Sequence, residues 1–204
     1  MILFGASGHC KSVIDIAESI GEKIPIIYDD NPKVEAICHI PVQKFKSEIS
    51  GLKETGLKEN WVISIGNNKN RKEVREKLSE KFGLLIHKTA SISSWSAIGD
   101  GTVVMAKVVI NASTKIGEHC IINSGAVIEH DCIVGDFAHI SPNASLAGGV
   151  TIGEGTQIGI GACVLPEISI GKWATIGAGA VIIRDVPDGA TVIGNPGRVI
   201  KINK

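Results

Sequence analysis

Residues 92 to 182 repeat a simple pattern with a period of six. Every sixth position from Ile92 to Ile182 holds Ile or Val, except for Leu146, and a small residue follows four places after most of these aliphatics. An α-helix repeats its apolar face about every 3.6 residues and a strand every two, so neither explains this spacing. A coil of three flat faces, about 18 residues long, does explain it, because each face buries one aliphatic against the next coil. The pattern predicts a β-solenoid of roughly five coils and disfavours a β-sandwich, whose strands would not hold one phase for so long.

The first 86 residues lack the six-residue repeat and have a different pattern of apolar residues. An apolar run at 1–4 leads into Gly5-Ala-Ser-Gly8 and then into a helical spacing of apolar residues up to Ile20. Two further apolar runs, 24–28 and 61–65, precede Asp29-Asp30 and Gly66-Asn67-Asn68, and a charged amphipathic helix is expected at 69–82, followed by apolar residues at 84–86. Strands that alternate with helices predict a small, mostly parallel α/β domain at 1–86, with ligands at the carboxyl ends of its strands. Residues 87–91 would join it to the solenoid, which gives a second domain at 87–204.

Composition narrows the classes of partner. The chain has 204 residues, and its 21 Lys and Arg balance 21 Asp and Glu, which argues against nucleic acid or an anionic membrane as the main partner. No apolar run approaches the roughly 18 residues of a membrane helix, and no leader precedes the first strand, so we expect a cytoplasmic protein. The odd number of cysteines, without a C-x-x-C pair, indicates a reducing compartment. The cysteines are Cys10, Cys38, Cys120, Cys132 and Cys163.

Glycine and polar residues follow each of the first three predicted strands. Gly5-x-x-Gly8 is only part of a dinucleotide fingerprint, but it permits a tight turn, and the amides that open the next helix can hold a phosphate. Asp29 and Asp30 stand where a carboxylate commonly meets a ribose or a base, although either is equally well a turn residue or a cap. Together the three strand ends favour a nucleotide ligand. The candidate substrate-binding residues are Ser7, Gly8, His9, Asp29, Asp30 and Gly66.

Seven segments carry a resemblance that spans almost the whole chain. They are Gly5-Ala-Ser-Gly-His9, Asp29-Asp30, Ile65-Gly-Asn-Asn68, Val127-Ile-Glu-His-Asp131, Phe137-Ala-His-Ile140, Cys163-Val-Leu-Pro166 and Val192-Ile-Gly-Asn-Pro196. With them the chain resembles the left-handed parallel β-helix acetyltransferases that carry an N-terminal Rossmann-like domain and act on nucleotide-linked amino sugars, the bacillosamine type, related to sialic acid O-acetyltransferases. The resemblance implies a nucleotide-sugar-binding domain at 1–86, an acetyltransferase domain at 87–204 with a C-terminal closing segment, and acetyl-CoA as co-substrate with no metal. The left hand of the coil follows from the resemblance and not from the hexads.

His130 is the polar interruption of the hexads that most suggests chemistry. An imidazole titrates near neutrality and can take a proton from an attacking amine or hydroxyl. The resemblance implies that His130 is the general base and that the adjacent Asp131 makes it more basic. The bacillosamine type has Glu at this position, so the shorter Asp131 is a departure. A solvated corner histidine is the alternative interpretation of His130.

Further residues are implied by the resemblance to hold acetyl-CoA. His139 would contact the coenzyme rather than transfer a proton, and the backbone at Ile160 and Ala178 would line the coenzyme groove, with Ala178 in place of a glycine. His119 has no role in the motif and is expected at the surface. The cations of the closing segment suit the coenzyme phosphates and are equally well solvated surface charges. These cations are Arg184, Arg198 and Lys201.

The expected reaction is acetyl transfer from acetyl-CoA to the amino group of a nucleotide-linked amino sugar, which the resemblance suggests is a UDP-4-amino-4,6-dideoxy sugar. Direct attack of the amine on the thioester needs no covalent enzyme intermediate. A backbone N–H of Gly148 or Gly149 is the expected donor to the developing oxyanion. A nucleophilic Cys120 or Cys132 is the competing mechanism, although both occupy small-residue places of the hexads, which favours inward packing.

Three other functions stay open on the sequence alone. An O-acetyltransferase would use the same base on a hydroxyl. A zinc hydratase of the γ-carbonic anhydrase type would bind its metal through histidines such as His119, His130 and His139, although the N-terminal domain and the closing segment argue against it. A non-enzymatic scaffold would tolerate the loss of His130. The resemblance further implies a homotrimer with active sites between neighbouring solenoids.

Overall fold

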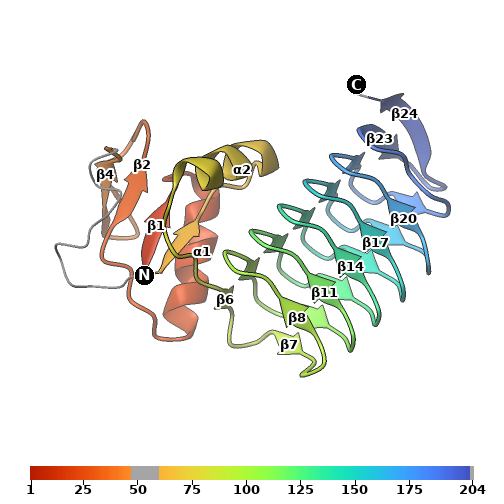
Figure 1. Ribbon diagram of the computed structural model, residues 1–204, viewed down its shortest axis with the longest axis horizontal. Helices are drawn as coiled ribbons and strands as arrows, with labels where there is room; N and C mark the ends of the chain where they lie inside the picture. The colour runs from red at the N-terminus through yellow and green to blue at the C-terminus, as the bar shows by residue number, and fades with distance from the viewer. Residues whose placement is uncertain (47–59, 203–204) are drawn as a thin grey trace.

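The computed structural model describes residues 1–46 and 60–202 and shows two units side by side (Figure 1). The first is an α/β unit around a five-stranded sheet in the order β3-β4-β2-β1-β5, and the second is a β-solenoid made of three sheets. No helix within these described ranges is long and apolar enough to cross a membrane.

The α/β unit has the predicted alternation of strands and helices. Leu3 of β1 pairs in parallel with Ile27 of β2 and with Val62 of β5, and β2 pairs in parallel with β4. An antiparallel hairpin of β3 and β4 at the sheet edge is the part that the sequence did not predict. The elements are β1 Ile2–Phe4, α1 Gly8–Ser19, β2 Ile27–Asp29, β3 Ala36–Ile37, β4 Ile40–Lys44, β5 Trp61–Ile63 and α2 Asn68–Lys77.

The turn between β1 and α1 needs a glycine at its first position. Gly5 has a φ of +114°, and a Cβ on it would lie 2.5 Å from Cγ1 of Ile65, so a larger residue would meet both backbone strain and a clash. The Gly5 N–H donates to the carbonyl of Tyr28 at 2.7 Å, which ties the turn to β2. The turn therefore presents the start of α1 at the carboxyl edge of the sheet.

The second helix is shorter than the predicted 69–82, because it ends at Lys77. Leu78 leaves the helix with φ −96° and ψ 122° and is buried. Phe82 then forms a parallel bridge with Trp61. Burial of these two apolar side chains against the sheet outweighs the helical propensity of the charged segment between them.

The solenoid strands stack in three parallel sheets with partners 18 residues apart, for example Ile110 with Ile128, so the coil length agrees with the hexads. One sheet contains β7 Ser91–Ile92, β10 Val109–Ile110, β13 Val127–Ile128, β16 Ser145–Leu146, β19 Cys163–Val164 and β22 Val181–Ile182. A second contains β8 Ala97–Ile98, β11 Lys115–Ile116, β14 Ile133–Val134, β17 Thr151–Ile152 and β20 Ser169–Ile170. The third contains β6 Leu85–Ile86, β9 Val103–Val104, β12 Ile121–Ile122, β15 His139–Ile140, β18 Gln157–Ile158, β21 Thr175–Ile176, β23 Ala190–Ile193 and β24 Arg198–Ile202.

The aliphatic position of each hexad points into the prism, and the corner three residues later has a left-handed backbone. Ile128 and Ile140 have no exposed surface, and small residues such as Ala126 and Ala138 are buried beside them. Glycine forms six of the fourteen left-handed corners between Gly101 and Gly179, and larger residues form the other eight, among them Asp131 with a φ of 61°. Because the corners recur with the same period as the core, every side chain in the solenoid has a fixed edge or face.

The solenoid is longer than the hexads predict, which corrects one sequence expectation. The apolar residues 84–86 were expected to complete the α/β unit, but Leu85 and Ile86 pair with Val103 and Val104, so β6 is the first strand of the solenoid. At the other end Ile170 bridges to Val186, and β23 adds to the third sheet before β24 returns antiparallel. The strand pairing therefore places the start of the solenoid at Leu85, before the expected boundary at residue 87.

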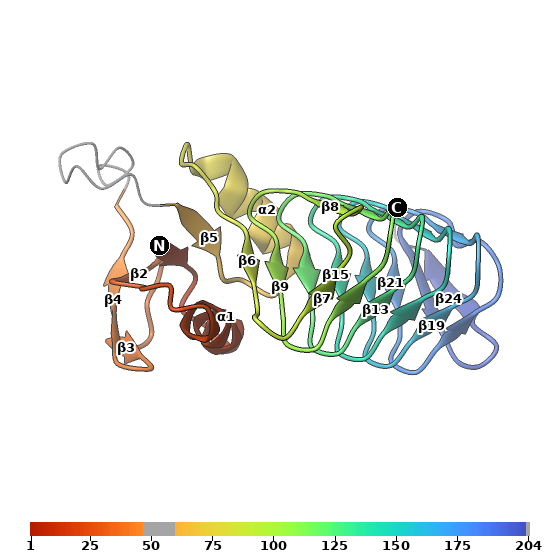
Figure 2. The same ribbon diagram turned by 90° about the horizontal axis from the view of Figure 1, so that it is seen from below.

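The two units share an apolar interface. Val103, Met105 and Ile121 of the third sheet pack in one cluster with residues of the α/β unit that include Val13 and Ile14 of α1. Figure 2 shows the α/β unit against the N-terminal end of the solenoid, and Figure 1 shows β24 at the opposite end. One face of the first coils is thus covered, while later coils leave theirs open.

Candidate active site

His130 and Asp131 form a hydrogen-bonded pair at a solenoid corner. Nδ1 of His130 lies 2.8 Å from Oδ2 of Asp131, and both side chains are about two-thirds exposed, 63% and 64%. A carboxylate only accepts hydrogen bonds, so Nδ1–H is the donor, and in the neutral tautomer Nε2 has the lone pair. The left-handed backbone at Asp131 turns the short carboxylate back toward the ring. The pair therefore has the arrangement of a base with an orienting carboxylate, in spite of the shorter acid.

The next coil supports the His130 ring through glycines. A Cβ on Gly148 would lie 2.6 Å from Cε1 and 2.8 Å from Nε2 of His130, so the ring lies directly over this residue. The Gly149 N–H donates to the carbonyl of His130 at 3.0 Å. That N–H is therefore committed to the backbone ladder, which corrects its choice as an oxyanion donor and leaves Gly148 as the candidate of the two.

The predicted substrate residues of the α/β unit gather at the carboxyl edge of its sheet. Ser7 is the N-cap residue of α1 but makes no side-chain capping bond, and a Cβ on Gly8 would meet nothing within 4 Å. Asp29 accepts from the Ala6 N–H at 2.7 Å and from the Asn31 N–H at 2.8 Å, which fixes both turns. Asp30 lies 3.4 Å from Nζ of Lys77. The open helix start is thus available to an anion, while Asp29 shapes the edge.

His9, Gly66 and His139 come together where the α/β unit meets the third sheet. The His9 and His139 rings have centroids 6.5 Å apart, and a Cβ on Gly66 would lie 3.6 Å from Cβ of His9. Nε2 of His139 lies 3.0 Å from Nδ2 of Asn123, whose oxygen accepts from the Ser124 N–H at 2.8 Å. With that oxygen already engaged, the amide nitrogen donates to His139. Sequence reasoning divided these residues between substrate and coenzyme, whereas the structure places them side by side.

Both histidines of this cluster are held neutral. Burial, and then the charge of Arg71, lower the pKa of His9 to about 4. Burial, then the charge of Arg71 and then that of His9 lower the pKa of His139 to about 3, against a backbone hydrogen bond to Gly66 that raises it. Nε2 of His9 is buried and has no hydrogen-bond partner among the described residues. Neither ring is therefore a cation near neutral pH.

Sequence reasoning missed Arg71, and its expectation for His119 was wrong. Arg71 of α2 is buried at 1% exposure between the two units, although its neighbours in sequence are charged. His119, expected at the surface, is also buried at 1%, because its ring stacks on Phe137 and meets the edge of Phe82, with centroids 5.3 and 4.5 Å away. The sequence of α2 has the pattern of a charged amphipathic helix, which predicts charges exposed to solvent. Burial of Arg71 and His119 could be predicted only by knowing that the α/β unit covers the first coils of the solenoid.

The predicted coenzyme residues lie on a different edge of the prism from His130. Ile160 and Ala178 are exposed and stack on successive coils, since the Gly179 N–H donates to the Ile160 carbonyl at 2.8 Å. Their corner joins the third sheet to the β7–β22 sheet, whereas His130 lies between the β7–β22 and β8–β20 sheets. His139 is on the third sheet, one coil before Ile160. A single chain therefore separates the candidate base from the candidate coenzyme groove.

The structure gives little support to a cysteine nucleophile or to a zinc site made of His119, His130 and His139. Cys120 and Cys132 are buried, as their hexad places predict, and burial raises the pKa of the Cys120 thiol to about 12 and also raises that of Cys132. His119 is in a buried corner, His130 on an exposed edge and His139 on the third sheet, so they do not form one metal site. Within the described ranges no group of three His, Cys, Asp or Glu residues is arranged to hold a metal ion.

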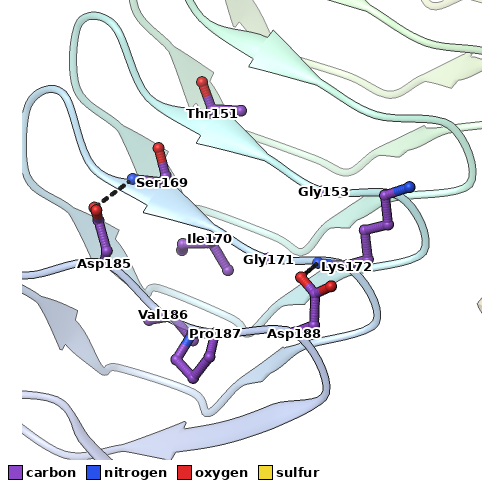
Figure 3. A pocket seen from close by; sticks show the side chains of 10 residues that line it. All are labelled: Thr151, Gly153, Ser169, Ile170, Gly171, Lys172, Asp185, Val186, Pro187 and Asp188. Atoms are coloured by element: carbon purple, nitrogen blue, oxygen red, sulfur yellow. Dashed lines mark hydrogen bonds between the residues drawn. The ribbon is translucent and has the colours of Figure 1, made fainter.

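Two shallow depressions lie at the C-terminal end of the solenoid. One, of about 490 Å³, lies along β17 and β20 and is bordered by residues 185–188, where Asp185 accepts from the Ser169 N–H at 2.8 Å and Asp188 from the Lys172 N–H at 2.7 Å (Figure 3). These carboxylates complete the hydrogen bonding of the last coil. The second, of about 380 Å³, is lined by Arg184 and Arg198, two of the three cations suggested for coenzyme phosphates.

Comparison with known proteins matches both units of the chain. Residues 1–78 match the family described as PglD N-terminal domain, and residues 96–130, 113–148 and 149–184 match bacterial transferase hexapeptide repeats. A curated relative, UDP-N-acetylbacillosamine N-acetyltransferase of Bacillus subtilis (strain 168), is 47% identical over 49 residues, which are 22% of this chain and 23% of the relative. The match thus spans about a quarter of that protein's length.

Solved structures match nearly the whole chain. A perosamine N-acetyltransferase variant from Caulobacter crescentus, in complex with CoA and GDP-perosamine, is 36% identical with a TM-score of 0.91 and covers 98% of this chain and 96% of its own. The acetyltransferase domain of PglB from Neisseria gonorrhoeae FA1090, in complex with acetyl coenzyme A, is 37% identical with a TM-score of 0.88 and covers 98% of both chains. These matches agree with the Rossmann-like and left-handed β-helix fold that the sequence predicts. The chain therefore belongs to the nucleotide-sugar N-acetyltransferases of the hexapeptide-repeat family, and with them to the acyltransferases.

Proposed function

We propose that this protein transfers an acetyl group from acetyl-CoA to the amino group of a sugar linked to a nucleoside diphosphate. The observation that carries the proposal is the His130–Asp131 pair, in which the carboxylate holds Nδ1–H at 2.8 Å and leaves Nε2 free to accept a proton. Relatives whose structures contain CoA with GDP-perosamine, or acetyl coenzyme A, support the same class of reaction.

The chemistry needs one proton transfer and no covalent enzyme intermediate. The neutral amine of the sugar attacks the thioester carbonyl carbon, and Nε2 of His130 accepts the proton that the nitrogen loses as the C–N bond forms. Asp131 stabilises the resulting imidazolium. The C–S bond then breaks, and the coenzyme thiolate takes up the proton. The Gly148 N–H, beneath the His130 ring, is our candidate donor to the carbonyl oxygen as its negative charge develops.

The α/β unit has the features to hold the nucleotide. The uncapped start of α1 at Ser7 and Gly8 offers backbone amides to the diphosphate, and the positive end of the helix dipole adds to the attraction. Asp30 and the turn that Asp29 organises would face the nucleoside, and His9 and Gly66 would border the sugar. A UDP-4-amino-4,6-dideoxy sugar is our first candidate, and the GDP-perosamine complex of a relative makes guanosine diphosphate the second to assay.

The separation of the candidate residues supports a homotrimer with sites between neighbouring solenoids. One chain supplies His9, Gly66 and His139 together with the edge of Ile160 and Ala178, but its own His130 is on another edge. Exposed aliphatics occur on both edges: Ile160 is 58% exposed, and Leu165 is 44% exposed on the edge of His130. Packing these edges against each other would bury apolar surface and bring His130 of a neighbouring copy to the coenzyme groove. We propose a cytoplasmic location, because five cysteines without a C-x-x-C pair favour a reducing compartment.

The test is a thiol-release assay with acetyl-CoA against a panel of UDP- and GDP-linked 4-amino and 3-amino sugars. We expect turnover on one amino sugar and a loss of about 10² or more in kcat for His130→Ala. His39→Ala removes an exposed histidine of the α/β unit and serves as the matched control, with activity unchanged.

The outcomes separate the remaining functions. Turnover only on a hydroxyl acceptor, such as a sialic acid, would assign the protein to O-acetyl transfer. Full activity in His130→Ala would show that His130 is not the general base. Absence of thiol release by the wild type with every acceptor would overturn the proposed acetyl transfer.

A further inference from the structure

The side chain of Arg71 makes five hydrogen bonds at the interface between the two units. Nε donates to the His119 carbonyl at 2.8 Å, and Nη1 to the carbonyls of Ile65 at 3.0 Å and Gly66 at 3.2 Å. Nη2 donates to Oδ1 of Asn68 at 2.9 Å and to the Phe137 carbonyl at 2.7 Å. A guanidinium has five N–H groups, and five oxygens are provided here.

None of these five acceptors is a carboxylate, so within the described residues the cation is buried without a carboxylate partner. Burial lowers the pKa of Arg71 to about 10, which still leaves it charged at neutral pH. Taking a charge out of water is costly, so a buried charge is by itself weak evidence for a stabilising role. Stability alone is therefore a poor reason for an arginine here, whereas a rigid planar fork is a good means of fixing several carbonyls at once.

The carbonyls that Arg71 holds belong to both halves of the candidate site. Ile65 and Gly66 form the loop after β5, at the carboxyl edge of the α/β sheet. His119 and Phe137 are corners of successive coils, both with left-handed backbone. Phe137 is two residues before His139, whose ring meets the same Gly66. One side chain thus spans the loop beside the sugar and the coil beside the coenzyme.

We propose that Arg71 is a positioning residue for acetyl transfer, which fixes the Ile65–Gly66 loop of the α/β unit against the coils that carry His119 and Phe137. This inference rests on the proposed function, because it concerns the distance between a sugar held by one unit and a thioester held by the other. Reacting atoms need to be about 3–3.5 Å apart, and an error of 1 Å costs on the order of 10² in rate.

Removal of the fork should not separate the two units. The apolar cluster between α1 and the third sheet stays intact, and so does the contact of Asn68 Nδ2 with the Gly155 carbonyl at 3.0 Å. The expected consequence is a loop displaced relative to the solenoid in a chain that is still folded. Each substrate would keep its own binding surface, and the alignment of the two would be lost.

The experiment compares Arg71→Met and Arg71→Lys with a matched control on the same helix. Lys72→Met removes the ion pair with Glu154, 2.6 Å long at the exposed border of the same interface, and is expected to leave kcat unchanged. For Arg71→Met we expect kcat to fall by about 10², while CoA and the free nucleoside diphosphate bind by calorimetry within about threefold of wild type. Arg71→Lys keeps a charge with three donors and should lose less.

The measurements distinguish positioning from a merely structural role. A lowered melting temperature with unchanged kcat, measured where the variant is folded, would overturn the proposal, and so would loss of affinity for either ligand alone that accounts for the whole effect. If Arg71→Met does not fold, the kcat of Arg71→Lys decides in the same way. If the wild type releases no thiol with any acceptor, the proposed function is overturned, and the positioning role of Arg71 with it.

Discussion

Substitution of Gly148 by alanine should displace the candidate base without unfolding the protein. The added methyl would lie 2.6 Å from Cε1, 2.8 Å from Nε2 and 3.3 Å from Nδ1 of His130, so it meets the face of the ring. Ordinary contact between carbon atoms is about 3.5–4.0 Å, which means that the ring has to retreat by about 1 Å. The backbone at Gly148 is not in the left-handed region, so alanine fits it without strain.

The expected magnitude follows from this displacement. A shift of about 1 Å in a positioned catalytic group costs on the order of 10² in rate, or about 2.7 kcal/mol of barrier. The His130 ring is mostly exposed and free to move outward, so the melting temperature should change by no more than a degree or two. We therefore expect kcat in the thiol-release assay to fall by about 10², with little change in the KM for acetyl-CoA.

The control for Gly148→Ala is the same change in a chain that has no ring to displace. In a His130→Ala background the methyl meets no imidazole, so the double variant should be no slower than His130→Ala alone. Full activity in Gly148→Ala would refute the reasoning, because it would mean that the position of the ring over this glycine is irrelevant to catalysis. An equal further loss in the double variant would refute it as well, and would point to the Gly148 backbone instead.

Three further predictions test neighbouring claims. Asp131→Asn removes the charge that stabilises the imidazolium and should lower kcat by about tenfold or more at constant Tm, measured by the same assay. Cys132→Ala should keep at least half of the activity, because its thiol is buried and protonated; loss of turnover would revive a cysteine nucleophile. Burial, and then the charges of Arg75 and Arg71, lower the pKa of His119 to about 4, so its neutral form contributes stability that is complete above pH 6.5 and declines as the pH falls toward 4. His119→Phe should therefore flatten the fall in Tm between pH 6.5 and 4, and an unchanged slope would contradict this.

The solenoid was predictable because its core and its corners repeat with one period. Ile92 and each aliphatic after it occupy equivalent positions, so a single count along the sequence assigns strands, corners and buried faces together. The ends were less predictable, because β6 and β23 pair with the solenoid through residues outside the hexads. The early end of α2 was missed for a different reason, since burial of Leu78 decided it and not the helical pattern.

The candidate base was predictable from the sequence because its partner is the next residue. His130 and Asp131 need only a corner to meet, and the hexads place that corner. Arg71 offers no such signal, because four of its five acceptors are backbone carbonyls and two of those belong to residues 48 and 66 positions away. Backbone acceptors leave no trace in residue type, so a side chain that binds them looks like any other charge on a helix surface.

The fold itself explains why one chain divides the candidate site between two edges. A prism of three sheets has three edges, and side chains 18 residues apart stay on one edge throughout its length. His130 and Ile160 are 30 residues apart, which is not a whole number of 18-residue coils, so no bend within the solenoid can bring them to one edge. Among the described residues, the α/β unit packs on the third sheet and on the corners at His119, Phe137 and Gly155, which form a different edge from that of His130. A second copy is then the simplest source of the missing base, and the fixed angle between the two units, which Arg71 maintains in our proposal, determines whether sugar, thioester and imidazole meet.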